Sequence, residues 1–155
     1  MHARCKSLTA VAAGALFVMT GWANAAEPVG PKLTPRLKDL ITEEMQLING
    51  ASAEVFQAIV AGDHATVAEL GQKIHGSFII KQALTDQDKA DLKAAVPPEF
   101  LALDAEFHGA AAKLAEAGDA QDVAQELTLF AQMTETCVAC HGTYASDRFP
   151  GLATE

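Results

Sequence analysis

Long apolar runs, positive charge and alternating polar–apolar segments are all scarce in this chain of 155 residues. Beyond residue 25, no segment approaches the roughly 18 unbroken apolar residues of a membrane-spanning helix. The chain has 11 Lys and Arg against 20 Asp and Glu, so its net negative charge excludes unaided binding to nucleic acid or to an anionic membrane. Without period-two alternation we expect no β-sheet. The sequence also lacks the H-E-x-x-H, G-x-S-x-G and phosphate-loop signatures, and we do not expect an enzyme.

The first 25 residues have the pattern of a secretory signal peptide. A short basic start, Met1 to Lys6, precedes an apolar run from Leu8 to Met19, and Ala23-Asn24-Ala25 follows as an A-x-A cleavage site. We expect residues 1–25 to be cleaved and a single domain, residues 26–155, to be exported to the periplasm. Cleavage removes two cations and no acids, which takes the net charge from −9 to −11.

The segment Cys137-Val138-Ala139-Cys140-His141 carries the chemistry of the chain. Cys-x-x-Cys-His is the attachment sequence of c-type haem. On a helix, positions three and four apart share a face, so both thiols can reach the vinyl groups along one porphyrin edge. His141 then supplies the proximal iron ligand. The motif predicts one covalent haem c per chain, held by Cys137 and Cys140.

Two other interpretations of the motif are weaker. A thioredoxin-like redox pair belongs in a βαβ setting, which the sequence does not offer. A zinc site needs further cysteine or histidine ligands at metal spacing, and the third cysteine, Cys5, lies in the expected signal peptide. Both cysteines of the mature chain are then used by haem, and no disulfide is expected.

Helical periodicity covers most of the mature chain. Apolar residues at three- and four-residue steps predict helices over 35–61, from 64 to about 83, from 99 to about 117, and from 120 to about 145. Thr34-Pro35 is typical of a helix start. Gly62-Asp63 and Gly118-Asp119 each predict a glycine stop followed by an aspartate cap. We interpret residues 85–98 as a connection with one short helical turn over 86–95. The expected fold is all-α, an antiparallel up-down four-helix bundle with haem on the last helix.

At this point the sequence resembles the cytochrome c′ family of class II c-type cytochromes. The resemblance covers nearly all of the mature chain, and it rests on the haem motif with Tyr144 three residues after His141, together with Phe100, Phe107, Leu114 and Ala117-Gly118-Asp119, and Met45 followed by Ala61-Gly62-Asp63. It implies a four-helix bundle, one covalent haem on the last helix, and often a homodimer through the first two helices.

The family divides by its sixth iron ligand, for which Met45 is the candidate here. Met45 lies on the apolar stripe of the first helix, near the position of the family's distal residue, and Met/His ligation suits electron transfer. A core methionine that only fills space is the alternative. Five-coordinate members commonly carry a basic residue four after the haem histidine, and here that position is Ala145. A bis-histidine site, with His75 as the best candidate, is a weaker alternative.

Five other side chains are candidates for a role at the site or in the core. Tyr144 shares a helix face with His141, so it is a candidate haem contact or a packing residue at the end of the helices. Arg148 can pair with a haem propionate or remain a surface arginine. We expect His64 to be an exposed helix-start residue and His75 to lie at a core boundary, as we expect of His108.

The sequence thus predicts a periplasmic carrier of single electrons, with His141 proximal and Met45 distal on the iron. Its partners are redox proteins. The alternative is a five-coordinate cytochrome c′ that binds nitric oxide or carbon monoxide. The two differ in the spin state of the iron.

Overall fold

The computed structural model describes residues 27–153, and within that range the chain is helical with no β-strand. The predicted signal peptide, its cleavage site after Ala25 and Cys5 lie outside the described residues. No helix between residues 27 and 153 is long and apolar enough to cross a membrane. The all-α fold class is therefore confirmed for the described chain.

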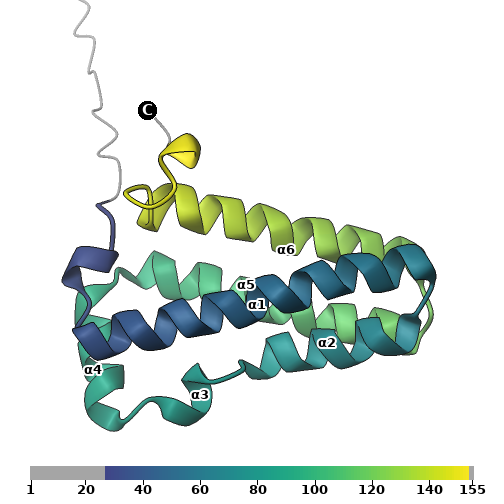
Figure 1. Cartoon of the computed structure of the whole chain (residues 1–155), viewed down its shortest axis with the longest axis horizontal. Coiled ribbons are helices and arrows are strands. Elements are labelled where there is room, and N and C mark those ends of the chain that lie inside the picture. The colour runs from purple at the N-terminus through teal and green to yellow at the C-terminus, as the bar shows by residue number, and fades with distance from the viewer. Residues whose placement is uncertain (1–26, 154–155) are drawn as a thin grey trace, which may run out of the picture.

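Four long helices lie alongside one another (Figure 1). They are α1 (Pro35–Ala61), α2 (His64–Gly76), α5 (Pro98–Asp119) and α6 (Val123–Tyr144). The short helices are η1 (Gly30–Lys32), α3 (Ile80–Ala83), α4 (Asp86–Ala95) and η2 (Pro150–Leu152). The most extensive packing joins α2 to α5 and α5 to α6, whereas α1 touches α6 only sparsely.

The molecule has two unlike ends (Figure 1). At one, which we call the corner end, the α1–α2 and α5–α6 connections turn tightly. The start of α1, the last turn of α6 and the short helix α4 are all at the other end, which we call the motif end. The cysteine–histidine motif is in the last turns of α6, so it belongs to the motif end.

The caps predicted for both ends of the first helix and for the start of the second are present. The Thr34 hydroxyl accepts a hydrogen bond from the Leu37 N–H at the start of α1. At its other end Gly62 has φ +69°, a conformation that suits glycine. Asp63 then accepts from the Thr66 N–H to cap α2. The first predicted helix, residues 35–61, is confirmed at both ends.

The second predicted helix is wrong beyond Gly76. Instead of continuing to Ala83, the chain breaks at Ser77, where φ is +62°. The buried carboxylate of Glu44 stabilises the break, because it accepts hydrogen bonds from the Ser77 hydroxyl and from three successive backbone N–H groups, those of residues 78–80. A charge on α1 thus replaces the helical hydrogen bonds that α2 gives up there.

Two further boundaries differ from prediction. Residues 86–95 form a ten-residue helix rather than one turn, because Thr85 and Asp88 cap each other reciprocally. Gly118 does not end a helix: it lies inside α5, where a Cβ would be 2.6 Å from the Ala68 nitrogen on α2. The cap of α6 is Asp122, not Asp119.

The buried apolar side chains form two separate clusters rather than one core. The first joins α1, α2, α5 and α6 toward the corner end and includes Val55, Ile74, Leu114 and Met133. The second occupies the motif end and includes Val29, Leu33, Leu37, Val96 and Tyr144. The boundary between the two clusters falls at the level of the cysteine motif, because Cys137 packs against the first and Cys140 against the second.

Candidate functional site

The two motif cysteines lie on the inward side of α6, one against each apolar cluster. Cys137 packs against the corner-end cluster and Cys140 against the motif-end cluster. Asp122 starts α6 by accepting from the Gln125 N–H, and the unbroken helix carries both thiols on one face. The pair therefore sits at the boundary of the two clusters, as a group attached through both sulfurs would require.

Both thiols are free and half-buried. Burial raises the pKa of Cys137. For Cys140, burial and then the negative charge of Asp104 on α5 raise the pKa to about 11. The thiols are protonated at neutral pH, unlike the low-pKa cysteines of thiol–disulfide enzymes. This disfavours the redox-pair interpretation of the motif.

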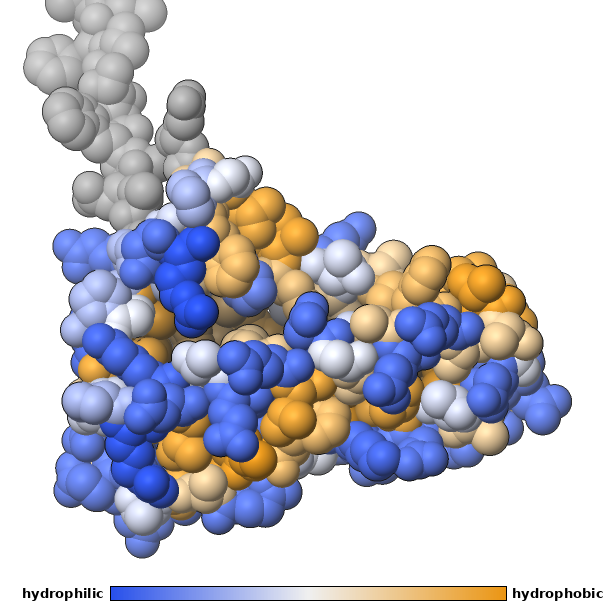
Figure 2. All heavy atoms as spheres, viewed as in Figure 1, coloured by the Kyte–Doolittle hydropathy of each residue, from blue (hydrophilic) through white to orange (hydrophobic). Residues whose placement is uncertain are grey.

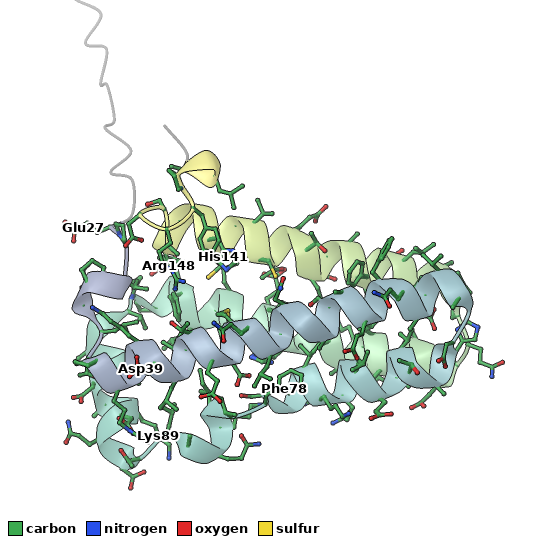
Figure 3. The ribbon with its side chains drawn as sticks, viewed as in Figure 1. Glu27, Asp39, Phe78, Lys89, His141 and Arg148 are labelled. Carbon is green, nitrogen blue, oxygen red and sulfur yellow. The ribbon has the colours of Figure 1, made fainter. Side chains whose placement is uncertain are left out.

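His141 is half-buried and projects toward α1 (Figure 3). Burial, together with the positive charge of Arg148, lowers its pKa, which favours the neutral imidazole that binds metals. The other three described histidines each make a hydrogen bond through Nδ1. Within residues 27–153 no hydrogen bond engages the ring of His141, which instead stacks on the ring of Phe149.

Met45 is less buried than its place on the apolar stripe predicts. Its exposed fraction is 39%, so the expectation of a buried Met45 is wrong. At 100° per residue it lies about 80° from Leu37, the fully buried centre of the stripe. Along α1, however, Met45 falls between Ile41 of the motif-end cluster and Ile48 of the corner-end cluster. It is therefore level with the boundary at which the cysteines lie, and its role as a ligand stays a prediction.

Tyr144 and Arg148 both follow His141 in the chain, at the motif end. Tyr144 is buried, with its ring edge-on to Phe100 at a centroid distance of 5.4 Å, and its carbonyl accepts from the Val29 N–H. It is thus a packing residue of the motif-end cluster, next to Cys140. Arg148 is exposed and lies beside His141 (Figure 3), where a guanidinium can meet a carboxylate.

His75 and His108 join α2 to α5. The Nδ1–H of each donates to a backbone carbonyl on the other helix, His75 to His108 at 3.0 Å and His108 to Ile74 at 2.7 Å. Both are partly buried, as predicted for boundary residues. These bonds hold the α2–α5 contact and give His75 a structural role, which disfavours its use as an iron ligand.

His64 differs from prediction. It begins α2, but its side chain is only 21% exposed and its Nδ1 lies 2.8 Å from Oε1 of Glu126 on α6. Glu126 is fully buried, and its Oε2 has no hydrogen-bond partner among the described residues. The pair ties α2 to α6 at the corner end, far along α6 from the motif.

Three of these features were not predicted from the sequence. Glu44 lies seven residues after Leu37, and this spacing places it on the buried face of α1. Glu126 lies seven residues before Met133 and is placed inward on α6 in the same way. Their hydrogen-bond partners, 33 and 62 residues away, have no local signal. Phe149 lies eight residues after His141, beyond the end of α6, so helical spacing does not link the two. For Phe149 we see no sequence signal that would have indicated the stack.

The described residues fit a covalently attached haem. The donor set that haem c needs is present on α6: two inward thiols three residues apart and an imidazole four residues after the first. Apolar side chains of the two clusters lie on both sides of this set and match the apolar surroundings of a haem. Figure 2 shows an apolar hollow between α6 and α1, bordered by hydrophilic side chains. No cluster of three or more metal-binding side chains occurs in residues 27–153, and a haem iron needs only one or two.

Comparisons of this chain with family models, with curated proteins and with solved structures each gave no match.

Proposed function

We propose that this protein is an exported c-type cytochrome that carries single electrons through one covalent haem. The observation that carries the proposal is the placement of Cys137, Cys140 and His141 on one inward face of α6, at the boundary between two apolar clusters. The four long helices would then form an antiparallel four-helix bundle of the cytochrome c′ kind, with the haem between α1 and α6.

Each residue has a distinct task in this proposal. Cys137 and Cys140 form the thioethers, and the neutral imidazole of His141 is the proximal ligand. A bound haem supplies a reversible one-electron couple. Met45 on α1 would supply the second iron ligand, and a thioether sulfur in that role would raise the reduction potential of the haem. Arg148 balances a propionate, and the two apolar clusters exclude water and so lower the local dielectric.

The net negative charge of the chain favours a basic protein as the redox partner and disfavours binding to a polyanion. Acidic residues outnumber basic ones by 20 to 11 in the whole sequence. A surface of that sign attracts a basic partner at low ionic strength and repels nucleic acid. The association rate with such a partner should fall as salt is added, because the attraction is screened over about 10 Å at 0.1 M.

Covalent attachment is the first test. The full-length gene is expressed in a host that matures c-type cytochromes, and the purified chain is analysed by mass spectrometry and by haem staining after denaturation. We expect one haem on the wild type, a singly attached haem in Cys140→Ala, and an altered iron spectrum in His141→Ala. Cys5→Ala is the control and should match the wild type. A wild-type chain without haem, or an unchanged spectrum in His141→Ala, would sink the proposal.

The sixth ligand is tested by the optical spectrum of the oxidised protein. With Met45 on the iron, the spectrum is low-spin with a sulfur-to-iron band at long wavelength, and Met45→Ala abolishes both. Met133→Leu is the matched control, because Met133 is 2% exposed on α6 itself and packs in the corner-end cluster. It should leave the spectrum unchanged.

The gas-binding alternative has one observation in its favour. The side chain of Met45 is 39% exposed and lies off the centre of the stripe, so it can turn toward solvent and leave the sixth position of the iron open. That function predicts a high-spin spectrum that shifts on addition of carbon monoxide, and a Met45→Ala variant that behaves like the wild type.

A further inference from the structure

Phe149 makes a ring stack with the motif histidine. The centroids of the Phe149 and His141 rings are 4.2 Å apart and their planes differ by 3°. The stack covers one face of the imidazole and leaves the ring edge, which carries the nitrogens, uncovered. Phe149 is 37% exposed, so part of its ring remains open to solvent while the rest is covered by this contact.

The chain after α6 is built to bring Phe149 to this position. The N–H groups of Arg148 and Phe149 both donate to the Ala145 carbonyl, at 2.9 and 3.0 Å. The Leu152 N–H donates to the Phe149 carbonyl, which closes η2. Residues 145–152 therefore turn back onto α6 and do not extend away from it, and we call this segment the return turn.

Gly142 lets the return turn lie directly on α6. A Cβ at this position would be 2.4 Å from the Leu152 carbonyl oxygen, a distance at which something must shift. Gly142 is buried and is the residue next to His141. The close approach of backbone to backbone and the parallel stack of the two rings are thus two independent features that fix the same turn over the same histidine.

We propose that Phe149 is a positioning residue that fixes the rotation of the His141 imidazole, and with it the plane of the proximal ligand on the iron. This inference rests on the proposed function. Outer groups that orient a metal-binding histidine commonly do so by a hydrogen bond. No group in residues 27–153 hydrogen-bonds to this ring, whereas the other three described histidines are held in that way. The stack on Phe149 takes over the orienting role.

Proton NMR of the oxidised holoprotein tests the role, because the paramagnetic shifts of the four haem methyl groups depend on the orientation of the axial imidazole plane. In Phe149→Leu we expect a changed order or a narrowed spread of these methyl shifts, because the imidazole ring of His141 is then free to rotate. Phe149→Tyr retains the stack and should keep the wild-type order. Gly142→Ala displaces the return turn without removing either ring, and should change the order as Phe149→Leu does.

Two controls separate orientation from other effects. With Met45 on the iron, the reduced protein is low-spin and diamagnetic, and its haem methyl shifts report the direct ring current of residue 149. That contribution is subtracted. Phe56→Leu removes a phenylalanine that is 57% exposed on α1 and should leave the order unchanged. Wild-type methyl shifts in Phe149→Leu would overturn the positioning role alone. A wild-type chain that carries no covalent haem would overturn the proposed function together with this inference.

Discussion

Replacing Glu44 by glutamine tests how the motif end is held together. The carboxylate is 2% exposed. Its Oε1 accepts from the Ser77 hydroxyl at 2.8 Å and the Phe78 N–H at 2.9 Å, while Oε2 accepts from the N–H groups of Ile79 and Ile80 at 2.8 and 3.2 Å. A glutamine side chain keeps one accepting oxygen. Its amide group, which only donates, must face two of the four donors.

The size of the effect follows from this geometry. Each buried donor that loses its acceptor costs about 1–3 kcal/mol, and the bonds lost are charge-assisted, which makes them stronger than neutral ones. Relaxation of the Ser77 segment recovers part of the loss. We expect Glu44→Gln to lower the free energy of unfolding by about 3 kcal/mol, and the thermal midpoint by about 10 °C.

The pH dependence of this effect has a definite sign. Burial by itself would raise the pKa of Glu44, but the hydrogen bonds from Ile79, Phe78, Ser77 and Ile80 outweigh it, so the folded pKa lies below the ordinary 4.5. The contribution of the carboxylate is therefore complete above pH 4.5 and is lost as the pH falls through the lower, folded value. The stability difference between the wild type and Glu44→Gln should shrink over that acidic range.

The assay is denaturant unfolding followed by circular dichroism, at pH 7 and at several acidic pH values. Glu43→Gln is the matched control, because Glu43 is the exposed neighbour of Glu44. It should change stability by less than about 0.5 kcal/mol. A Glu44→Gln protein as stable as the control at pH 7, or a difference that grows in acid, would refute the argument that this carboxylate stabilises the break after α2.

Two further predictions concern the corner end. Gly118→Ala should destabilise the protein by about 1–3 kcal/mol, because the new Cβ would lie 2.6 Å from the Ala68 nitrogen. The control Gly109→Ala, whose Cβ would have nothing within 4 Å, should stabilise its helix by up to about 1 kcal/mol. Equal changes of the thermal midpoint in the two variants would contradict this prediction. His64→Ala should cost about 3 kcal/mol, because it leaves the fully buried Glu126 without its hydrogen-bond partner. Glu126→Met should leave the free energy of unfolding nearly unchanged, because it removes the buried carboxylate itself. If denaturant titrations show that it destabilises the protein as much as His64→Ala does, the argument that the cost comes from an unpaired buried Glu126 is wrong.

Local signals in the sequence predicted helix ends well where a single residue caps or stops the helix by itself. Thr34, Gly62 and Asp63 act on the backbone within four residues of themselves, and their roles were predicted correctly. The same Gly-Asp pair at residues 118–119 gave a wrong helix end, because Gly118 serves the contact between α5 and α2. The helix break at Ser77 has no such signal. It depends on Glu44, which is 33 residues away in sequence. The spacing of seven residues from Leu37 places Glu44 on the buried face of α1, but it does not indicate which backbone groups the carboxylate binds.

The candidate site shows the same division. The motif spacing on one helix was enough to place Cys137, Cys140 and His141 together, because three- and four-residue steps on a helix need no tertiary information. The exposure of Met45 depends on where α1 meets α6, and the Phe149 stack depends on a turn beyond the helix. Both arise from packing between segments, which periodicity does not describe.

The break in α2 and the candidate site are physically linked through α1. Glu44 and Met45 are consecutive residues, so the carboxylate that binds the Ser77–Ile80 segment also fixes the height and rotation of α1 at the level of the methionine. That level is where the two apolar clusters separate. Loss of the anchor should therefore loosen Met45 as well as destabilise the fold. In Glu44→Gln we expect the sulfur-to-iron band to weaken at a temperature where circular dichroism still reports full helix content, and in Glu43→Gln we expect both signals to be lost together on heating.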